Sequence, residues 1–233
     1  MVPWQTDAMR TFIASIVAVA SVWAAQPAEP SRVLPPAGTT KLAASLASAK
    51  PVARHLWRDT PPTNPDGTVN AYIEIARGDR NKWEYDMAKN ARALDRVIPE
   101  KLGTYPVNYG IVPQTVSYDG DPFDVLVVGP PIEGGRLVRG VIIGLFLMED
   151  EKGDDAKVVL SPVDGSGRPT HQLEPSHQQQ MVEFFRHYKD DQPGFYSKVA
   201  GWASAEHGRA HVTVTHAFFK QCGARAGSAC EIR

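Results

Sequence analysis

The stretch Ser117-Tyr118-Asp119-Gly120-Asp121-Pro122-Phe123-Asp124-Val125-Leu126-Val127-Val128 places three carboxylates within six residues. Gly120 and Pro122 disfavour a regular helix or a central strand, so we expect a turn or bulge that leads into a strand over residues 123–128. Such a turn can bring the carboxylates to one point, where hard cations such as Mg²⁺ or Mn²⁺ relieve their mutual repulsion. An isolated Asp-Gly-Asp is also typical of a solvated acidic turn, so other parts of the chain must decide between the two readings.

Two strands and an irregular segment are expected ahead of this stretch. Residues 69–75 alternate as a strand and carry Glu74 among apolar neighbours, and residues 82–86 follow as a second strand after a turn. We expect a short connection around Arg96. Residues 104–110 are rich in aromatic residues, Gly and Pro, so they are expected to be non-helical and to bring two tyrosines close to the acidic turn.

After the acidic turn, a long β-rich segment leads into a second acidic run. Residues 137–148 are apolar on both faces, with glycines where a barrel strand would bend. They end in residues 149–157, a charged run that by itself is typical of a solvated hairpin. A short strand is expected to follow over residues 158–160.

Two helices are expected in the last third of the chain. Ser176-His177-Gln178-Gln179 has the pattern of a capping box and predicts a helix to about Tyr188. Apolar residues at helical spacing predict a second helix over about residues 204–221, although the β-branched run 211–215 opposes it. The buried side of the first helix is expected to carry Met181, Val182 and Phe185.

Length and charge limit the class of protein. The 233 residues, 42% of them hydrophobic, suffice for one domain with a sizeable core and are short for two. A formal net charge of −1 lacks the basic excess typical of nucleic-acid-binding proteins. We therefore expect no nucleic-acid partner.

Residues 1–25 have the pattern of a secretory signal peptide. An apolar run over residues 11–25 follows Arg10, precedes small residues and prolines, and is short for a membrane span. We expect cleavage just after residues 22–24, a periplasmic or secreted product, and no stable membrane association after cleavage. An uncleaved anchor is the alternative.

Two further segments flank the expected domain of residues 67–221. Residues 26–66 form a Pro- and Ala-rich extension, which is expected either to be mobile or to lie against the domain through Leu56 and Trp57. Residues 222–233 form a C-terminal tail.

The two cysteines of the chain, Cys222 and Cys230, lie in that tail. They lack the companions of a metal site, so we expect a disulfide formed in an oxidising compartment. Two free thiols are the alternative.

The motifs together resemble the soluble family I inorganic pyrophosphatases of bacterial type. The signature Asp-x-Asp-Pro-x-Asp-Val of that family stands at residues 119–125, and the resemblance covers about residues 69–220. Several separate motifs in family order exceed what chance agreement would produce. They are Ile73-Glu74-Ile75, Lys82-Trp83-Glu84-Tyr85, Asp95-Arg96, Tyr105-Pro106-Val107-Asn108-Tyr109-Gly110, Asp150-Glu151-Lys152-Gly153-Asp154-Asp155-Ala156-Lys157 and His187-Tyr188-Lys189-Asp190.

The resemblance implies a fold and a reaction. The fold is α+β and mainly β, a five-stranded OB-like closed β-barrel flanked by two main α-helices, with the acidic groups at one mouth. The reaction is the Mg²⁺-dependent hydrolysis of inorganic pyrophosphate to two phosphates. Attack of water on such a highly charged anion requires positive charge at both phosphoryl groups and an activated water, which agrees with the inventory of residues.

The resemblance also implies a role for each site residue. Asp121 is the general base, and Glu84 and Tyr105 support the residues that contact ligands. The residues that bind several Mg²⁺ ions, for which Mn²⁺ or Zn²⁺ could substitute, are Asp119, Asp124, Asp155, Asp150 and Glu74. The residues that bind phosphate oxygens are Lys82, Arg96, Tyr109, Lys157, Tyr188 and Lys189, of which Tyr109, Lys82 and Arg96 are also counted as catalytic.

Some features depart from the family pattern and leave alternatives open. Residues 161–175 form a shorter segment than in cytoplasmic bacterial members, and the family assembles as homo-oligomers through surfaces near the departing parts. A homo-oligomer is therefore an expectation whose size stays open. Two other functions remain: a relaxed phosphoanhydride or polyphosphate hydrolase, and a non-catalytic metal- or phosphate-binding protein.

Overall fold

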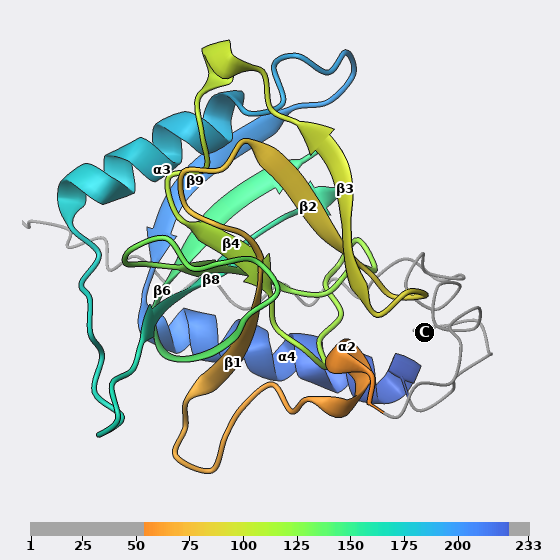
Figure 1. Ribbon diagram of the computed structural model, residues 1–233, viewed down its shortest axis with the longest axis vertical. Coiled ribbons are helices and arrows are strands. Elements are labelled where there is room, and N and C mark those ends of the chain that lie inside the picture. The colour runs from red at the N-terminus through yellow and green to blue at the C-terminus, as the bar shows by residue number, and fades with distance from the viewer. Residues whose placement is uncertain (1–53, 224–233) are drawn as a thin grey trace, which may run out of the picture.

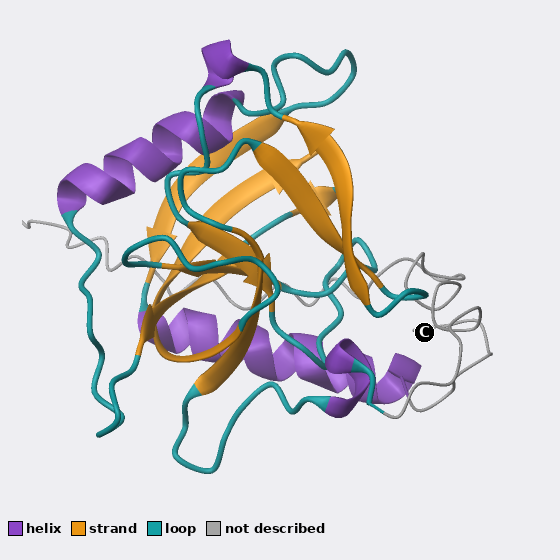
Figure 2. Cartoon of the chain, in the orientation of Figure 1, coloured by secondary structure: helices purple, strands orange, loops and turns teal. Residues whose placement is uncertain are grey.

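The computed structural model describes residues 54–223, so the expected signal peptide, most of the extension and Cys230 lie outside the described residues. The described part consists mainly of strands, with two long helices on its outside (Figure 1, Figure 2). None of the helices within residues 54–223 combines the length and the apolar character that crossing a membrane requires.

Five strands form a closed ring. Neighbouring strands pair antiparallel except for the parallel pair β5–β8, and the ring closes where β6 pairs back with β1. The OB-like, mainly β fold expected from the sequence is therefore confirmed. In ring order the strands are β1 (Val69–Ile75), β4 (Asn108–Ile111), β5 (Asp124–Val127), β8 (Lys157–Pro162) and β6 (Leu137–Asp150).

Four more strands extend this architecture. β6 continues past the ring and pairs with β7 (Gly153–Asp154) and with β9 (Ser197–Ala203), which the sequence analysis did not anticipate. β2 (Asn81–Asp86) and β3 (Ala91–Val97) form a separate hairpin. The expected short connection around Arg96 is wrong, because these residues pair with β2 although they are largely exposed and show no apolar alternation.

Three α-helices lie outside the ring in the described part: α2 (Leu56–Asp59), α3 (Pro175–His187) and α4 (Ala205–Gly223). The capping box predicted at Ser176 is wrong. Pro175, whose ring presets a helical φ, starts the helix two residues earlier than a cap at Ser176 would, so the N-cap is Glu174, which makes no side-chain cap hydrogen bond.

The long helices bury different faces. α3 buries Met181, Phe184 and Phe185, whereas Val182 is only partly covered. α4 forms as expected despite its β-branched run, because tertiary packing outweighs propensity: Val212 is buried against the ring. Thr215 Oγ1 donates to the His211 carbonyl at 2.8 Å within the helix.

A glycine brings α4 close to β6. A Cβ at Gly208 would lie 2.7 Å from Ile142 Cγ2 and 2.9 Å from the Gly144 carbonyl oxygen. The helix therefore packs against the ring at a distance that only glycine permits without a shift.

The segment before β1 is packed into the domain. Trp57 on α2 is fully buried beside Phe219 of α4, with ring centroids 4.7 Å apart. In the described part of the extension, Leu56 and Trp57 contact the domain, as one of the two alternatives predicted; residues 26–53 lie outside the described residues.

Candidate active site

The acidic stretch forms the turn that its sequence predicts. Gly120 has a φ of 87°, a left-handed conformation that glycine adopts without strain, and Gly120 N donates to the Ser117 carbonyl at 3.0 Å. Asp121 N donates to Asp119 Oδ1 at 3.0 Å. The turn leads directly into β5, which begins at Asp124.

Asp124 and Asp155 share a buried lysine. Lys157 Nζ lies 2.6 Å from Asp124 Oδ2 and 2.9 Å from Asp155 Oδ1, and its side chain is only 1% exposed. The Tyr109 hydroxyl donates to Asp124 Oδ2 as well. Because burial and then the charge of Asp124 raise the pKa of Tyr109 well above its ordinary value, this hydroxyl stays a hydrogen-bond donor.

The pKa of Asp155 reflects the crowding of acids. Burial raises it to about 7, against the opposing charge of Lys157 and together with the charges of Asp124 and Asp150. A carboxylate in this environment is stabilised by additional positive charge.

Two more lysines lie between pairs of carboxylates. Lys189 Nζ, at the end of α3, is 2.7 Å from Asp150 Oδ2 and 3.0 Å from Glu151 Oε2. Lys152 Nζ is 2.9 Å from Asp119 Oδ2 and 3.4 Å from Asp121 Oδ2. Burial acts to raise the pKa of Asp119, but the charge of Lys152 and the hydrogen bonds to Asp119 act against it, and the pKa of Asp119 is lowered.

Glu74 lies deepest among the acids. Its side chain is buried in β1, where Glu74 Oε1 accepts a hydrogen bond from Tyr85 N at 2.6 Å. Burial and then the charge of Asp124 raise the pKa of Glu74 well above its usual range. Strand β1 thus contributes a buried acid whose pKa is raised mainly by its burial.

The β2–β3 hairpin contributes the other cations. Lys82 Nζ lies 2.7 Å from Glu84 Oε1 and 2.9 Å from Asp95 Oδ2. Arg96 donates to the Tyr188 carbonyl at 2.7 Å and pairs with Asp191 at 3.2 Å. Arg96 therefore joins the hairpin to the end of α3.

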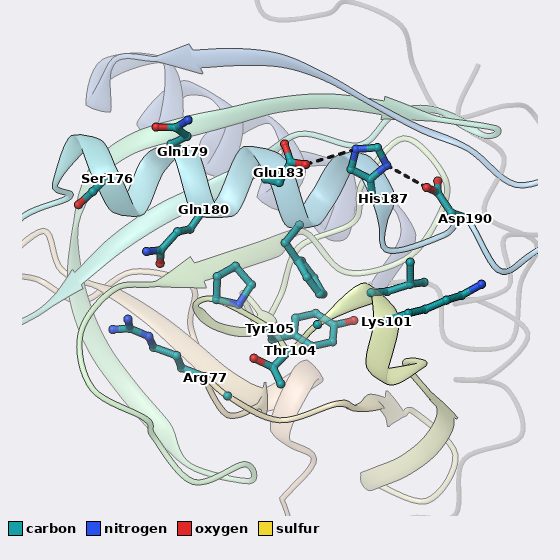
Figure 3. A pocket seen from close by; sticks show the side chains of 15 residues that line it. Arg77, Lys101, Thr104, Tyr105, Ser176, Gln179, Gln180, Glu183, His187 and Asp190 are labelled. Carbon is teal, nitrogen blue, oxygen red and sulfur yellow. Dashed lines mark hydrogen bonds and ion pairs between the residues drawn. The ribbon is translucent and has the colours of Figure 1, made fainter.

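Aromatic rings separate this constellation from a neighbouring pocket. The Tyr105 ring lies 5.7 Å from Tyr109 and 4.9 Å from Phe184, centroid to centroid. On the other side of Tyr105 is an open pocket of about 920 Å³, with Arg77 and Lys101 at opposite ends (Figure 3). None of the five aspartates of the site lines this pocket, so the chemistry is not placed in it.

Several of the predicted site residues are joined by contacts. Lys152 Nζ links Asp119 and Asp121 of the acidic turn to the second acidic run, where Lys152 N donates to Asp150 Oδ1 at 2.8 Å, and Lys157 links Asp124 with Asp155. The sequence analysis assigned no role to Lys152, Glu151 or Asp191. Lys152 could have been found as the one basic residue within the acidic run 149–155. The predicted pair of Cys222 and Cys230 stays a prediction.

No set of three or more His, Cys, Asp or Glu side chains within residues 54–223 is arranged to hold a metal ion, because lysine ammonium groups lie between the acids. The donor chemistry nevertheless fits hard divalent cations. Five aspartates supply only oxygen atoms, and the raised pKa of Asp155 beside Asp124 marks a negative charge that cations would offset.

Comparison with known proteins gives a consistent result. A family model described as inorganic pyrophosphatase matches residues 71–220. The inorganic pyrophosphatase of Sulfolobus acidocaldarius is 37% identical over 153 residues, which are 63% of this chain and 88% of that protein. That of Caulobacter vibrioides is 38% identical over 151 residues, 61% of this chain and 85% of that protein. The crystal structure of inorganic pyrophosphatase from Thermus thermophilus has a TM-score of 0.64 and 34% identity, covering 70% of this chain and 98% of its own.

Proposed function

The chain belongs to the inorganic pyrophosphatase family, and we propose that it hydrolyses inorganic pyrophosphate to two phosphates at its acidic mouth, using water and divalent cations. In this reaction an oxygen of water bonds to one phosphorus, the bond from that phosphorus to the bridging oxygen breaks, and the second phosphate leaves. The enzyme is thus an inorganic diphosphatase.

One observation carries this proposal. Asp124 accepts from the Tyr109 hydroxyl and pairs with Lys157, and Lys157 also pairs with Asp155, so that these residues lie on or next to three adjacent ring strands, β4, β5 and β8. Acids and cations therefore alternate within a single mouth. A substrate rich in negative charge needs the cations, and the water that attacks it needs a base.

The site residues are proposed to have two roles apart from metal binding: accepting a proton and binding phosphate. Asp121, on the turn and partly exposed, is proposed to accept the proton of the attacking water. The groups proposed to bind and orient the phosphoryl oxygens are Lys82, Arg96, Lys157, Lys189, Tyr109 and Tyr188. The lysines now paired with acids would exchange those partners for phosphate when substrate binds.

Mg²⁺ is the proposed ion, held by Asp119, Asp124, Asp150 and Asp155, with Glu74 close by; Mn²⁺ or Zn²⁺ could replace it. Bound cations would offset the charge of pyrophosphate and lower the pKa of water at the site. The all-oxygen donor set supports a hard ion over a soft one.

Location and assembly are also proposals. The apolar run over residues 11–25 supports export, so the mature enzyme is proposed to be periplasmic or secreted, as a homo-oligomer of open size. Under oxidising conditions Cys222 and Cys230 should be bridged. Intact mass without reduction should be two hydrogens lower than after reduction, and free thiols on exported protein would contradict the bridge.

A substrate and metal panel tests the function. Purified enzyme is supplied in turn with pyrophosphate, short polyphosphates and nucleoside triphosphates, each with Mg²⁺, Mn²⁺ or Zn²⁺, and phosphate release is measured. Turnover of pyrophosphate with Mg²⁺ far above the other substrates is the expected result. A protein that binds Mg²⁺ and pyrophosphate without releasing phosphate would overturn the proposal.

A further inference from the structure

The segment Arg54–Thr60, which we call the anchor, lies ahead of the residues matched by the family model and contains α2. Three of its seven residues are buried. Trp57 is 0% exposed, His55 1% and Thr60 2%. The buried residues of the anchor contact two segments that are connected to active-site residues: the turn of the β2–β3 hairpin and residues 114–115.

One set of contacts reaches the turn of the β2–β3 hairpin. His55 Nε2 lies 2.9 Å from the Met87 carbonyl oxygen, and Leu56 N donates to Asn90 Oδ1 at 2.8 Å. Asn90 Nδ2 donates back to the Arg54 carbonyl at 3.0 Å, while Tyr85 OH donates to Asn90 Oδ1. The anchor therefore holds the turn of the hairpin, whose opposite end carries Lys82 and Arg96.

A second set reaches the segment that precedes the acidic turn. Gln114 N donates to the Trp57 carbonyl at 2.9 Å, and Gln114 Nε2 donates to the Arg58 carbonyl at 2.7 Å. Trp57 Nε1 donates to the Thr115 carbonyl at 3.0 Å in the buried interior. Both sides of α2 are thus bonded to residues 114–115.

Thr115 passes this connection on to the far end of the acidic turn. Its hydroxyl donates to the Val112 carbonyl at 2.6 Å and accepts from Phe123 N at 2.9 Å. Thr115 lies just before the turn and Phe123 just after it, so this one side chain holds the two ends of the loop that carries Asp119 and Asp121 together.

We infer that the anchor is a positioning element: residues 54–56 hold the turn of the phosphate-binding hairpin, Trp57 holds the segment before the acidic turn, and together they set the placement of the aspartates relative to Lys82 and Arg96. The inference rests on the site assignment proposed above. Groups that orient ligating residues typically change metal affinity or activity by about 10–100-fold when they are lost. Trp57 touches no substrate and acts through Thr115.

The test compares two anchor variants with a matched control. Trp57→Phe keeps an aromatic ring and removes the N–H donor to Thr115, while Gln114→Asn removes the reach to Arg58 and suits the left-handed φ of 51° at that position. Trp202→Phe is the control, since the same chemical change there falls on a ring that packs on Phe146 of β6.

Mg²⁺ affinity is measured by calorimetric titration without pyrophosphate, and kcat and KM are measured well below the melting temperature of each variant. We expect about tenfold weaker Mg²⁺ binding and lower kcat in both anchor variants, with Trp202→Phe within about twofold of wild type. Gln114→Asn provides the readout should Trp57→Phe fail to fold.

Unchanged Mg²⁺ affinity, kcat and KM in anchor variants that merely melt earlier would overturn the inference and leave the anchor a purely stabilising segment. A wild-type chain without pyrophosphatase activity would overturn the proposed function instead, and the Mg²⁺ titration would still decide the role of the anchor.

Discussion

Asp121 and Asp124 lie in the same acidic stretch but have different surroundings. Asp124 accepts from Tyr109 and pairs with the buried Lys157, whereas Asp121 lies at the more exposed Lys152, 3.4 Å away. A carboxylate such as Asp124, which is surrounded by hydrogen-bond donors, is held in place and so suits the role of a metal ligand. One at the rim suits a base that must gain and lose a proton.

Asp121→Asn should therefore separate chemistry from binding. The substitution keeps the shape and removes the basic oxygen, so pyrophosphate turnover should fall by about 10²–10⁴-fold while Mg²⁺ and pyrophosphate still bind. Asp124→Asn is the comparison, because losing a ligand weakens metal binding itself. Raising Mg²⁺ should restore part of the Asp124→Asn activity and little of the Asp121→Asn activity; equal restoration of both would remove Asp121 from the role of base.

The acidic residues of the site could be predicted from the sequence, whereas the lysines that pair with them could be predicted only in part. The acids stand in short motifs whose residue types already indicate oxygen ligands. That Lys157 lies between Asp124 and Asp155 follows from the parallel pairing of β5 with β8. A pairing between strands so far apart in the chain leaves no local pattern, so the ion pairs of Lys157 could not be predicted from the sequence.

At the scale of the element, α4 depends on its closest approach to β6. Gly208→Val places a branched side chain where Ile142 and the Gly144 carbonyl already lie. We expect the free energy of unfolding, measured with urea, to fall by about 1–3 kcal/mol.

Thr213→Val introduces the same side chain on the exposed face of the same helix and serves as the control. A Gly208→Val protein with the urea midpoint of the control would show that helix and ring are not in tight contact there.

Helix α2 contains an ion pair that gives the anchor a pH dependence. A side-chain hydrogen bond from Arg58, opposed by burial and reinforced by His55 N, lowers the pKa of Asp59 to about 2 from 3.8. Because the folded-state pKa is depressed, the carboxylate stabilises the fold above the unfolded pKa and loses this effect as the pH falls toward 2.

Asp59→Asn should therefore lower the urea midpoint at pH 6, and the difference from wild type should shrink between about pH 4 and pH 2. Glu133→Gln, in an exposed loop, is the control and should differ from wild type by a similar amount throughout. A difference for Asp59→Asn that stays constant with pH would contradict the role of its charge.

Prediction of the strands succeeded where the sequence is rich in apolar residues and failed where pairing alone makes the strand. β1 and β6 carry apolar patterns and were placed correctly, whereas β3 is exposed and exists through its ladder with β2. The capping box at Ser176 failed for a local reason, since Pro175 moved the start of the helix.

For the molecule as a whole, divalent cations should stabilise the fold as well as support catalysis. The acids of the mouth are assembled only in the folded chain, so ions bind the folded state preferentially. At a free Mg²⁺ concentration 100 times the Kd, the gain is about 2.7 kcal/mol. The melting temperature should thus rise with Mg²⁺ and return to its lower value with EDTA. An equal ionic strength of NaCl is the control, and a melting temperature that ignores Mg²⁺ would argue against ions at this mouth.

The order of strands around the ring has a consequence for how the chain assembles during synthesis. β1, β4 and β5 can pair as soon as they emerge, but the outer edges of β1 and β5 wait for β6 and β8, up to residue 162. Closure that depends on such distant partners is slow, and until then two strand edges stay open to wrong pairing. A nascent chain with this topology therefore needs protection from aggregation until residues 157–162 have emerged.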